Sequence, residues 1–305
     1  MRVLITGGTG TIGRRLVLHL LKHGHPVTVV SRQAYKPANL PAKISFAQWD
    51  GRTAAGWGHC VEEADAIVNL AGAGIADARW TEARKKEILD SRVQAGQAVV
   101  EAISAASKKP AVLIQVSAVG YYGVHNDDEV ITEESGPGND FLAQVGQAWE
   151  ASTEPVEGLG VRRVIIRSGV VLDPQGGAFP RLVLPFRFFA GGPIGFGRQW
   201  FPWIHFYDEV AAIRYLIEHS QARGPFNLTA PQPLRNRELA RKVGQVMKRP
   251  ALAMVPAFVF KLIFGEMATV LLDGQRVVPK RLQEIGYNFK FPQVEEALAD
   301  LLKQS

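Results

Sequence analysis

The sequence predicts an α/β fold, with a Rossmann-like, doubly wound parallel sheet and a smaller C-terminal lobe of mixed, mainly helical structure. Short apolar runs alternate with runs of helical periodicity from residue 3 to about residue 167. Such alternation is typical of a parallel sheet with right-handed crossovers. A glycine-rich turn joins the first predicted strand to the first predicted helix, and beyond about residue 175 the alternation stops.

The first strand, turn and helix carry the strongest motif. Val3–Thr6 predicts a buried strand, and apolar residues from Ile12 onward repeat at helical spacing up to Gly24. Between them the glycines form G-x-x-G-x-x-G, the spacing of a turn that brings backbone and a helix N-terminus to a pyrophosphate. We therefore expect cofactor contacts from this segment at Gly7, Thr9, Gly10, Thr11, Ile12 and Gly13.

The later elements follow the same alternation. Strands are predicted over 25–30, 44–49, 66–70, 111–116 and 161–167, and helices over 82–106 and 141–157. Residues 1–175 are predicted to form an NADP-binding Rossmann domain, to which 208–230 could return. Residues 176–248 are predicted to form a region of loops and helices on the substrate side of the domain. Residues 249–305 are predicted to form a small helical domain.

Composition excludes several classes of protein. The 305 residues are 47% hydrophobic and 21% charged, and the net charge of +6 comes from scattered Lys and Arg, so no nucleic-acid partner is expected. Cys60 is the only cysteine, and the histidines form no ligand set, so no metal is expected. Residues 251–264 are apolar but too short to span a bilayer, and no signal peptide precedes the first strand. We expect no membrane partner and a cytoplasmic location.

The end of the second predicted strand selects the cofactor. NAD-binding chains place Asp or Glu about 20 residues beyond the glycines, where it binds the ribose 2′-hydroxyl. This chain has Ser31 and Arg32 there. Because a guanidinium pairs with a 2′-phosphate, we expect NADP(H). The alternative is that Arg32 is an ordinary surface arginine.

A second motif follows the predicted strand at 66–70. Its small residues would allow backbone to approach the ribose and adenine of a bound dinucleotide. The expected contacts are Asn69, Leu70, Ala71 and Gly72.

With these motifs and Tyr122-Gly123 after the strand at 111–116, the chain resembles the extended short-chain dehydrogenase/reductase superfamily, which includes nucleotide-sugar epimerases and dehydratases. It is most similar to a divergent branch called "epimerase family protein", through segments such as 117–123, 167–172 and 191–195. The resemblance implies an NADP-binding Rossmann protein with a C-terminal domain of undefined role. It adds expected cofactor contacts at Lys86, Arg92, Ser117 and Arg167.

The chain departs from the superfamily at the catalytic pair. The superfamily uses Tyr-x-x-x-Lys, in which the lysine lowers the pKa of the tyrosine. None of the six tyrosines here has a lysine four residues later, and Leu142 and Gly146 stand at about the expected positions. The usual Ser or Thr partner is replaced by Ala118. A conventional epimerase mechanism cannot be carried over.

Other residues are therefore candidates for proton transfer. Tyr121 is the expected proton donor, with Ser117 beside it, because both follow a strand at the carboxyl edge of the sheet. The alternative is that Tyr121 packs the pocket wall. His205 is expected to be a core histidine, and Asp208 to cap the following helix. Residues 191–203 are predicted as the substrate-side wall, or alternatively as a seam between the lobes.

The sequence leaves two hypotheses for the function. The first is an NADP-dependent oxidoreductase acting on an unidentified small molecule. The second is a non-catalytic NADP(H)-binding sensor or regulatory scaffold, since a cell-division role is attached to some relatives. A sugar-nucleotide epimerase or dehydratase is disfavoured by the missing pair. Monomer and homodimer are both left open.

Overall fold

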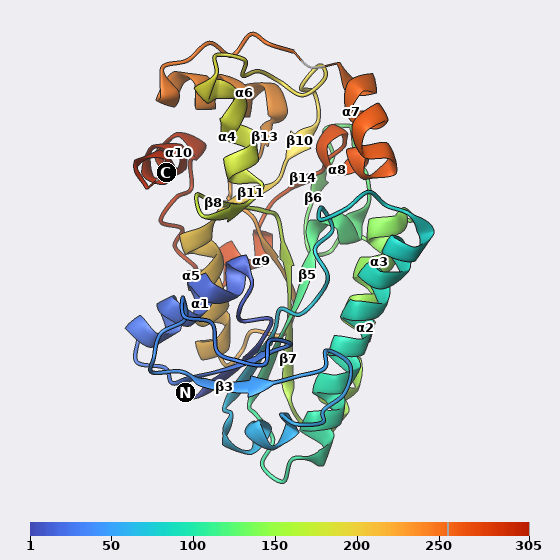
Figure 1. The fold of residues 1–305 in the computed structure, drawn as a ribbon, viewed down its shortest axis with the longest axis vertical. Helices are drawn as coiled ribbons and strands as arrows, with labels where there is room; N and C mark the ends of the chain where they lie inside the picture. Colours follow the sequence, from blue (N-terminus) through green and yellow to red (C-terminus); the bar gives the residue numbers. More distant parts are fainter. Residues whose placement is uncertain (255, 305) are drawn as a thin grey trace.

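The computed structural model describes residues 1–254 and 256–304, which form a sheet domain topped by a smaller lobe (Figure 1). The domain is built on a seven-stranded parallel sheet in the order β12-β7-β5-β4-β1-β2-β3. The strand order reverses beside β1, as in a doubly wound sheet. The predicted α/β fold class is confirmed. The strands are β1 (Val3–Thr6), β2 (Val27–Ser31), β3 (Ser45–Gln48), β4 (Ala66–Asn69), β5 (Val112–Ala118), β7 (Arg162–Ser168) and β12 (Gly224–Leu228).

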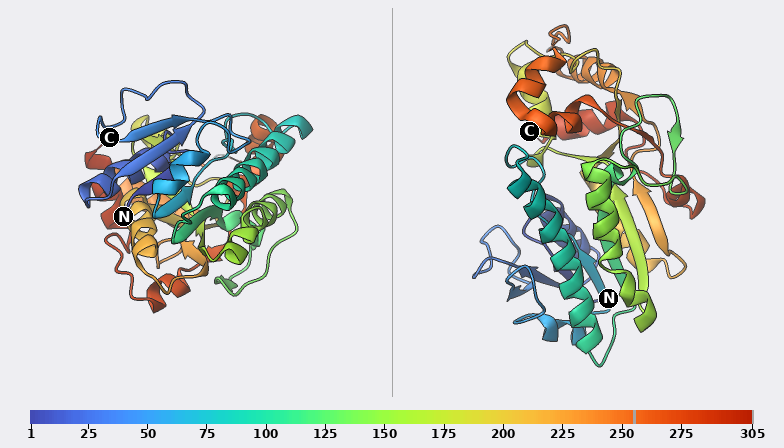
Figure 2. Two further views of the ribbon diagram at one scale, coloured as in Figure 1. Left: turned by 90° about the horizontal axis from the view of Figure 1, so that it is seen from below. Right: turned by 90° about the vertical axis from the view of Figure 1, so that its right-hand side faces the viewer.

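Helices cover both faces of this sheet. α1 (Thr11–Lys22) and α5 (Phe206–Glu218) pack together on one face, and α2 (Glu82–Ala105) and α3 (Phe141–Ala151) on the other (Figures 1 and 2). Alternate strand residues enter the two layers: Val3 and Ile5 pack with α1 and α5, whereas Leu4 packs with α2. Strands buried on both faces explain the continuous apolar runs of the sequence.

One predicted helix was too long. The helix expected over 141–157 ends at Ala151, and the 3₁₀ helix η3 (Glu154–Leu159) follows. Pro155 stands at the start of η3. Proline has no N–H to donate and disfavours helical geometry at the preceding residue, so α3 cannot continue through it. Two other 3₁₀ turns, η1 (Gly58–Glu63) and η2 (Val119–Tyr122), follow β3 and β5 in the chain.

The upper lobe has its own apolar cluster. β8 (Val170–Asp173), β9 (Gly176–Gly177) and β11 (Trp203–His205) form one small sheet, and β10 (Trp200–Phe201) and β13 (Leu234–Arg235) form another. Their buried residues pack with α4 (Phe179–Arg187), α6 (Asn236–Met247) and α10 (Val294–Lys303).

The chain crosses between the two parts more than once. After β11 it returns to the sheet through α5 and β12, and it then re-enters the lobe. The last elements are α7 (Ala257–Phe264), η4 (Gly265–Ala268), α8 (Thr269–Leu272), β14 (Arg276–Val277), α9 (Lys280–Glu284) and α10. β14 pairs with β6 (Val130–Ile131), and α9 packs on β12. Across the described residues, none of the helices has the length and apolar character needed to cross a membrane.

Candidate functional site

Of the three motif glycines around the turn between β1 and α1, two are closely packed and one is open. Gly7 has a φ of +70°, and a Cβ atom there would lie 2.9 Å from the Leu70 carbonyl carbon. A Cβ atom at Gly13 would lie 2.5 Å from the Gly7 carbonyl oxygen. Gly10 is exposed, and its Cβ would meet only that oxygen, at 3.3 Å. The loop therefore presents bare backbone at Gly10.

The first turn of α1 is suited to an anion. Gly10 is its N-cap, so no side chain caps the turn, and no acidic residue lies in it. The unpaired amide groups and the positive end of the helix dipole both favour a phosphate at this position. Thr11 and Ile12, which begin the helix, are half-buried. The residues present thus fit the pyrophosphate of a dinucleotide.

The end of β2 presents an arginine without a partner. Ser31 is buried, and its Oγ lies 3.2 Å from the Thr9 Oγ1. Arg32 is exposed, and its Cδ would lie 3.2 Å from a Cβ at Gly51, so glycine leaves room for the arginine stem. The guanidinium of Arg32 makes no hydrogen bond or ion pair with any residue in 1–254 or 256–304. This end of the site offers an unneutralised positive charge.

The motif after β4 offers mainly backbone, and few free side chains, to the cofactor site. Asn69 is fully buried; its Oδ1 accepts from the Thr6 Oγ1 at 2.6 Å, and its Nδ2 donates to the Gln115 Oε1 at 2.9 Å. The side chain of Asn69 therefore ties β1, β4 and β5 together. Leu70 and Ala71 pack against the two apolar layers, and Gly72 is exposed beside Arg92.

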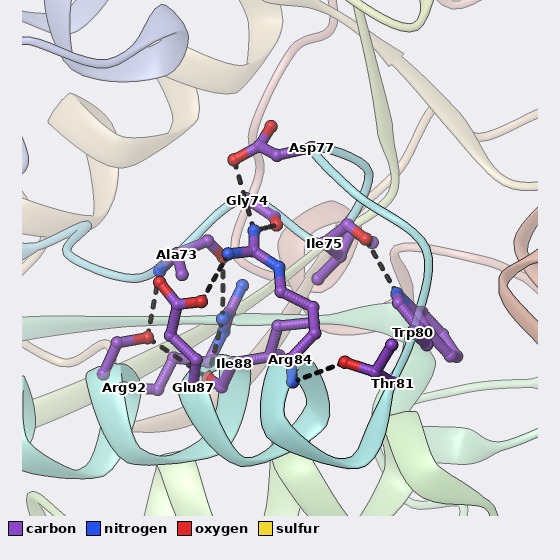
Figure 3. A network of polar contacts seen from close by, with 11 residues as sticks. Ala73, Gly74, Ile75, Asp77, Trp80, Thr81, Arg84, Glu87, Ile88 and Arg92 are labelled. Carbon is purple, nitrogen blue, oxygen red and sulfur yellow. Dashed lines mark hydrogen bonds and ion pairs between the residues drawn. The ribbon is translucent and has the colours of Figure 1, made fainter.

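Two arginines of α2 hold the loop that follows this motif (Figure 3). Arg92 is buried and donates from Nη1 to the carbonyl oxygens of Ala73 and Ile88, each at 2.9 Å. Its guanidinium lies 4.7 Å from the Trp149 ring, and burial lowers its pKa to about 10. Arg84 donates to the Gly74 carbonyl oxygen and pairs with Glu87 at 2.7 Å. These bonds fix the loop. The guanidinium of Arg92 therefore already has hydrogen-bond partners within the protein.

Lys86, the other residue of α2 expected at the cofactor, is exposed on the helix. Its ammonium pairs with Asp90 one turn later. An exposed pair of this spacing contributes a few tenths of a kcal/mol to the helix.

The segment after β5 places the two candidate catalytic residues differently. Ser117 is 2% exposed, and its Oγ has no hydrogen-bond partner among the described residues. Tyr121, in η2, is half-buried, and its ring lies 3.5 Å from the Arg167 guanidinium carbon. The hydroxyl of Tyr121 makes no hydrogen bond with the described part of the chain. Tyr121 is thus the one of the two with a reachable hydroxyl.

Arg167 is fully engaged beneath the two tyrosines. It is 4% exposed and donates from Nε and Nη2 to the two carboxylate oxygens of Glu150, at 2.9 and 2.8 Å. Its Nη1 donates to the Tyr122 hydroxyl at 3.0 Å, and that hydroxyl donates to the Asn227 Oδ1 at 2.7 Å. Burial raises the pKa of Tyr122 to about 12, so its phenol stays protonated. Arg167 therefore supports η2, the turn that carries Tyr121 and Tyr122, which we call the tyrosine turn.

The two positions of the missing catalytic pair lie against this same turn. A Cβ atom at Gly146 would be 3.1 Å from the Tyr121 Cα, and one at Gly120 would be 3.2 Å from the Leu142 Cβ. α3 and η2 are therefore in direct contact at Leu142 and Gly146. Because even a Cβ at 146 crowds the turn, a lysine side chain there would require η2 to move.

The start of α5 differs from the expectation. The Nδ1 of His205 accepts from the Tyr207 amide at 3.0 Å, so His205 caps the helix. The prediction that Asp208 is the cap was wrong: its carboxylate accepts from the amides of Lys290 and Phe291, each at 2.8 Å, and so fixes the C-terminal chain to α5. Those partners are over 80 residues away in sequence, so no local pattern reveals them.

Two features near the site escaped sequence reasoning. Arg15 of α1 donates to both carboxylate oxygens of Asp173, at 2.8 and 2.6 Å, and a Cβ at Gly176 would lie 3.0 Å from Thr11. The β8–β9 turn therefore lies over the first turn of α1. Glu209 is fully buried beside Ser168, whose Oγ donates to it at 2.6 Å, and burial raises the pKa of this carboxyl to about 8.

The segment predicted as the substrate-side wall is divided in the structure. Trp203 is buried in the lobe, and the Trp200 ring lies 4.1 and 5.0 Å from the guanidinium groups of Arg235 and Arg276. Phe196 and Arg198 are exposed. These residues therefore do not gather into a single wall.

The sheet, the glycine loop and the open helix N-terminus define an α/β dinucleotide-binding protein of the Rossmann type. The profile of the NAD dependent epimerase/dehydratase family matches residues 3–229, and that of a domain of unknown function, DUF1731, matches residues 255–301. The chain belongs to the NAD dependent epimerase/dehydratase family, in the extended short-chain dehydrogenase/reductase group, with a C-terminal DUF1731 domain. The resemblance seen in the sequence is confirmed.

Similar proteins share the whole length of the chain. An epimerase family protein SDR39U1 homolog, chloroplastic, of Arabidopsis thaliana is 41% identical over 99% of this chain and 87% of its own length. An epimerase family protein of Staphylococcus aureus is 37% identical over 99% of both chains. A crystal structure of the human epimerase family protein SDR39U1 (isoform 2) with NADPH superposes with a TM-score of 0.91, at 37% identity and full coverage of both chains. The site is therefore an NAD(P)-binding site.

Proposed function

We propose that the protein is an NADP(H)-dependent oxidoreductase that reduces or oxidises a small molecule without the usual Tyr-x-x-x-Lys pair. The observation that carries the proposal is the unpaired guanidinium of Arg32 at the end of β2, where NAD-binding proteins have a carboxylate. The human relative bound to NADPH is consistent with this choice of cofactor.

The residues divide the work of binding. The first-turn amides of α1 and the bare backbone of Gly10 would hold the pyrophosphate. Arg32 would pair with the 2′-phosphate, which a guanidinium binds in bidentate fashion. The loop fixed by Arg92 and Arg84 would cover the ribose side. A bound nicotinamide supplies hydride transfer.

Tyr121 is the proposed proton donor or acceptor for the substrate oxygen. Its neighbour Tyr122 is excluded because Asn227 and Arg167 occupy its hydroxyl. The guanidinium of Arg167, 3.5 Å from the Tyr121 ring, fixes the ring and places a positive charge beneath it. Ser117 would take part only if its buried Oγ became accessible.

Replacing Tyr121 by phenylalanine tests this role. We expect the rate of NADPH oxidation with a responsive carbonyl substrate to fall by about 100-fold, the usual effect of losing a general acid. The dissociation constant for NADPH should change by less than about twofold, because in this proposal the hydroxyl acts on the substrate oxygen and not on the cofactor phosphates. Tyr215→Phe, in the C-terminal half of α5, is the control and should retain the rate. Equal rates for wild type and Tyr121→Phe would remove Tyr121 from the mechanism.

A matched pair of glycine substitutions tests the pyrophosphate position. Gly10→Ala should leave the midpoint of thermal unfolding nearly unchanged, since its Cβ meets only one atom at 3.3 Å, but weaken NADPH binding by about tenfold or more. Gly13→Ala should lower the free energy of unfolding by about 1–3 kcal/mol, because its Cβ overlaps the glycine loop. Calorimetry and nicotinamide fluorescence separate the two effects. A Gly10→Ala protein with normal affinity would contradict the placement of the pyrophosphate.

A second function is favoured by the contact between α3 and η2. Leu142 and Gly146 pack the turn closely where catalytic side chains stand in the superfamily, as expected for a sensor or scaffold that binds NADP(H) without turning it over. The two functions differ in one measurement. Nicotinamide absorbance changes with some carbonyl or alcohol substrate for the oxidoreductase, and with none across a broad panel for the sensor.

A further inference from the structure

The upper end of the lobe exposes an unusual number of large apolar side chains. Leu252, Phe196 and Leu262 are 88%, 77% and 76% exposed, values far above those of a core residue. We call the whole set the apolar tip; it comprises Phe188, Phe189, Phe196, Leu252, Met254, Phe258, Leu262 and Ile263. A monomeric protein rarely exposes so many large apolar residues together unless they contact a partner.

Contacts between its segments make the apolar tip one surface. The amide of Ala253 donates to the Gly191 carbonyl oxygen at 3.1 Å, so the chain beside Leu252 and Met254 lies on the glycine turn that follows Phe189. The guanidinium of Arg249 lies 4.1 Å from the Phe189 ring. The Ala257 Cβ, at the start of α7, is 3.6 Å from where a Cβ at Gly195 would be. α4, α6 and α7 all reach this end of the molecule (Figure 1).

α7 is the least covered element of the tip. Its sequence, Ala257–Phe264, has seven apolar residues and Lys261, and none of its side chains is buried. A helix that is apolar on every side is normally enclosed by protein or lipid. α7 packs against η4 on one side and leaves Phe258, Leu262 and Ile263 uncovered.

The two chain segments that form the tip carry basic residues and no acidic ones, and Glu266, which follows them, is paired with Lys85. Residues 174–207 and 239–265 contain eight Lys or Arg and no Asp or Glu, whereas the whole chain has a net charge of +6. Seven of these basic residues are exposed and form no ion pair with a carboxylate of the described residues: Arg181, Arg187, Arg198, Arg241, Lys248, Arg249 and Lys261. The remaining one, Lys242, is paired with Glu295.

We propose that the apolar tip docks on the surface of an anionic lipid bilayer, with its apolar side chains in the headgroup region and its basic side chains on acidic lipid phosphates. Apolar residues flanked by unpaired Lys and Arg have the composition of a segment that lies in a membrane interface. A second copy of this chain is disfavoured, because two tips of the same charge would repel each other. The tip is also the outer end of the lobe (Figures 1 and 2).

This surface contact differs from a membrane span. Residues 251–264 are too short to cross a bilayer, which is why the sequence led us to expect no membrane partner. Interfacial binding requires only shallow insertion, and its strength comes jointly from apolar burial and charge. The inference is independent of the reaction proposed above.

The test is sedimentation of the full-length protein with two kinds of vesicle. We expect it to sediment with phosphatidylcholine vesicles that contain about one third phosphatidylglycerol, to remain in solution with pure phosphatidylcholine, and to release as salt rises. The double variant Phe258→Ser/Leu262→Ser should bind the anionic vesicles at least about tenfold more weakly. Lys261→Glu should weaken binding by about fivefold.

Matched controls separate docking from unfolding. Leu18→Ser and Lys22→Glu change an exposed leucine and an exposed lysine on α1, far from the tip, and should bind vesicles as the wild type does. Each variant should also bind NADPH as the wild type does and have the same midpoint of thermal unfolding. Failure of the wild type to sediment with anionic vesicles overturns the proposal. So does equal binding by the double variant, or a concentration-dependent dimer that the double variant abolishes.

Discussion

Replacing Arg32 by alanine is expected to weaken NADPH binding by about 10- to 100-fold and to leave NADH binding within about twofold. The expected size is that of a charge-assisted hydrogen bond to phosphate, about 1.5–3 kcal/mol. Arg32 is suited to this role because it is exposed, lies one residue beyond β2 and has no partner among the described residues. The measurement is titration of the purified protein with each cofactor, followed by nicotinamide fluorescence.

The control for this result is Arg181→Ala, which removes an exposed and unpaired arginine from the upper lobe. It should bind both cofactors as the wild type does, so a general loss of positive charge is excluded as the cause. A wild type that binds NADH and NADPH equally would contradict the choice of NADP(H). The same conclusion would follow if Arg32→Ala weakened both cofactors alike.

Replacing Glu150 by alanine is expected to lower the free energy of unfolding by about 3–5 kcal/mol, the usual cost of leaving a buried charge unpaired. Glu150 and Arg167 are 7% and 4% exposed and form two hydrogen bonds between α3 and β7. Without the carboxylate, the guanidinium retains the Tyr122 hydroxyl and the rings of Tyr121 and Tyr122, none of which carries a negative charge. Chemical denaturation at constant pH measures the difference.

Two further variants make that prediction specific. Glu157→Ala removes the partner of Arg163 at the surface, an ion pair of 2.6 Å whose carboxylate is 54% exposed, and should cost less than about 1 kcal/mol. The double variant Glu150→Ala/Arg167→Met should regain much of the lost stability, because it removes the unpaired charge. If Glu150→Ala cost no more than Glu157→Ala, the buried pair would not hold the tyrosine turn in place.

The parts of the candidate site whose local structure agrees with the sequence prediction are built from consecutive residues. Gly7, Gly10 and Gly13 lie within one turn, and their spacing is dictated by the geometry of a strand, a turn and a helix. The place of Ser31 and Arg32 follows from the next strand in the same way. A short sequence pattern of this kind adopts the same backbone geometry in different proteins. Its structure can therefore be predicted without knowledge of the whole fold.

The parts that were missed depend on residues far apart in the chain. The resemblance implied cofactor contacts at Arg92 and Arg167, and it gave no sign that Arg92 also bonds to Ala73 and Arg167 to Glu150. An arginine side chain is long enough to reach in several directions, and its partner is chosen by packing. The contact of Arg15 with Asp173 spans 158 residues and has no local signature.

The sequence by itself determined the sheet, the dinucleotide loop and the absence of the Tyr-x-x-x-Lys pair, because periodicity and motif spacing are properties of neighbouring residues. Only the tertiary structure decided that Tyr121 lies on a buried Arg167–Glu150 pair, that His205 and not Asp208 caps α5, and that α7 is left uncovered. Each of these depends on which distant elements meet, and the free energy of that packing is set by the whole fold rather than by any one segment.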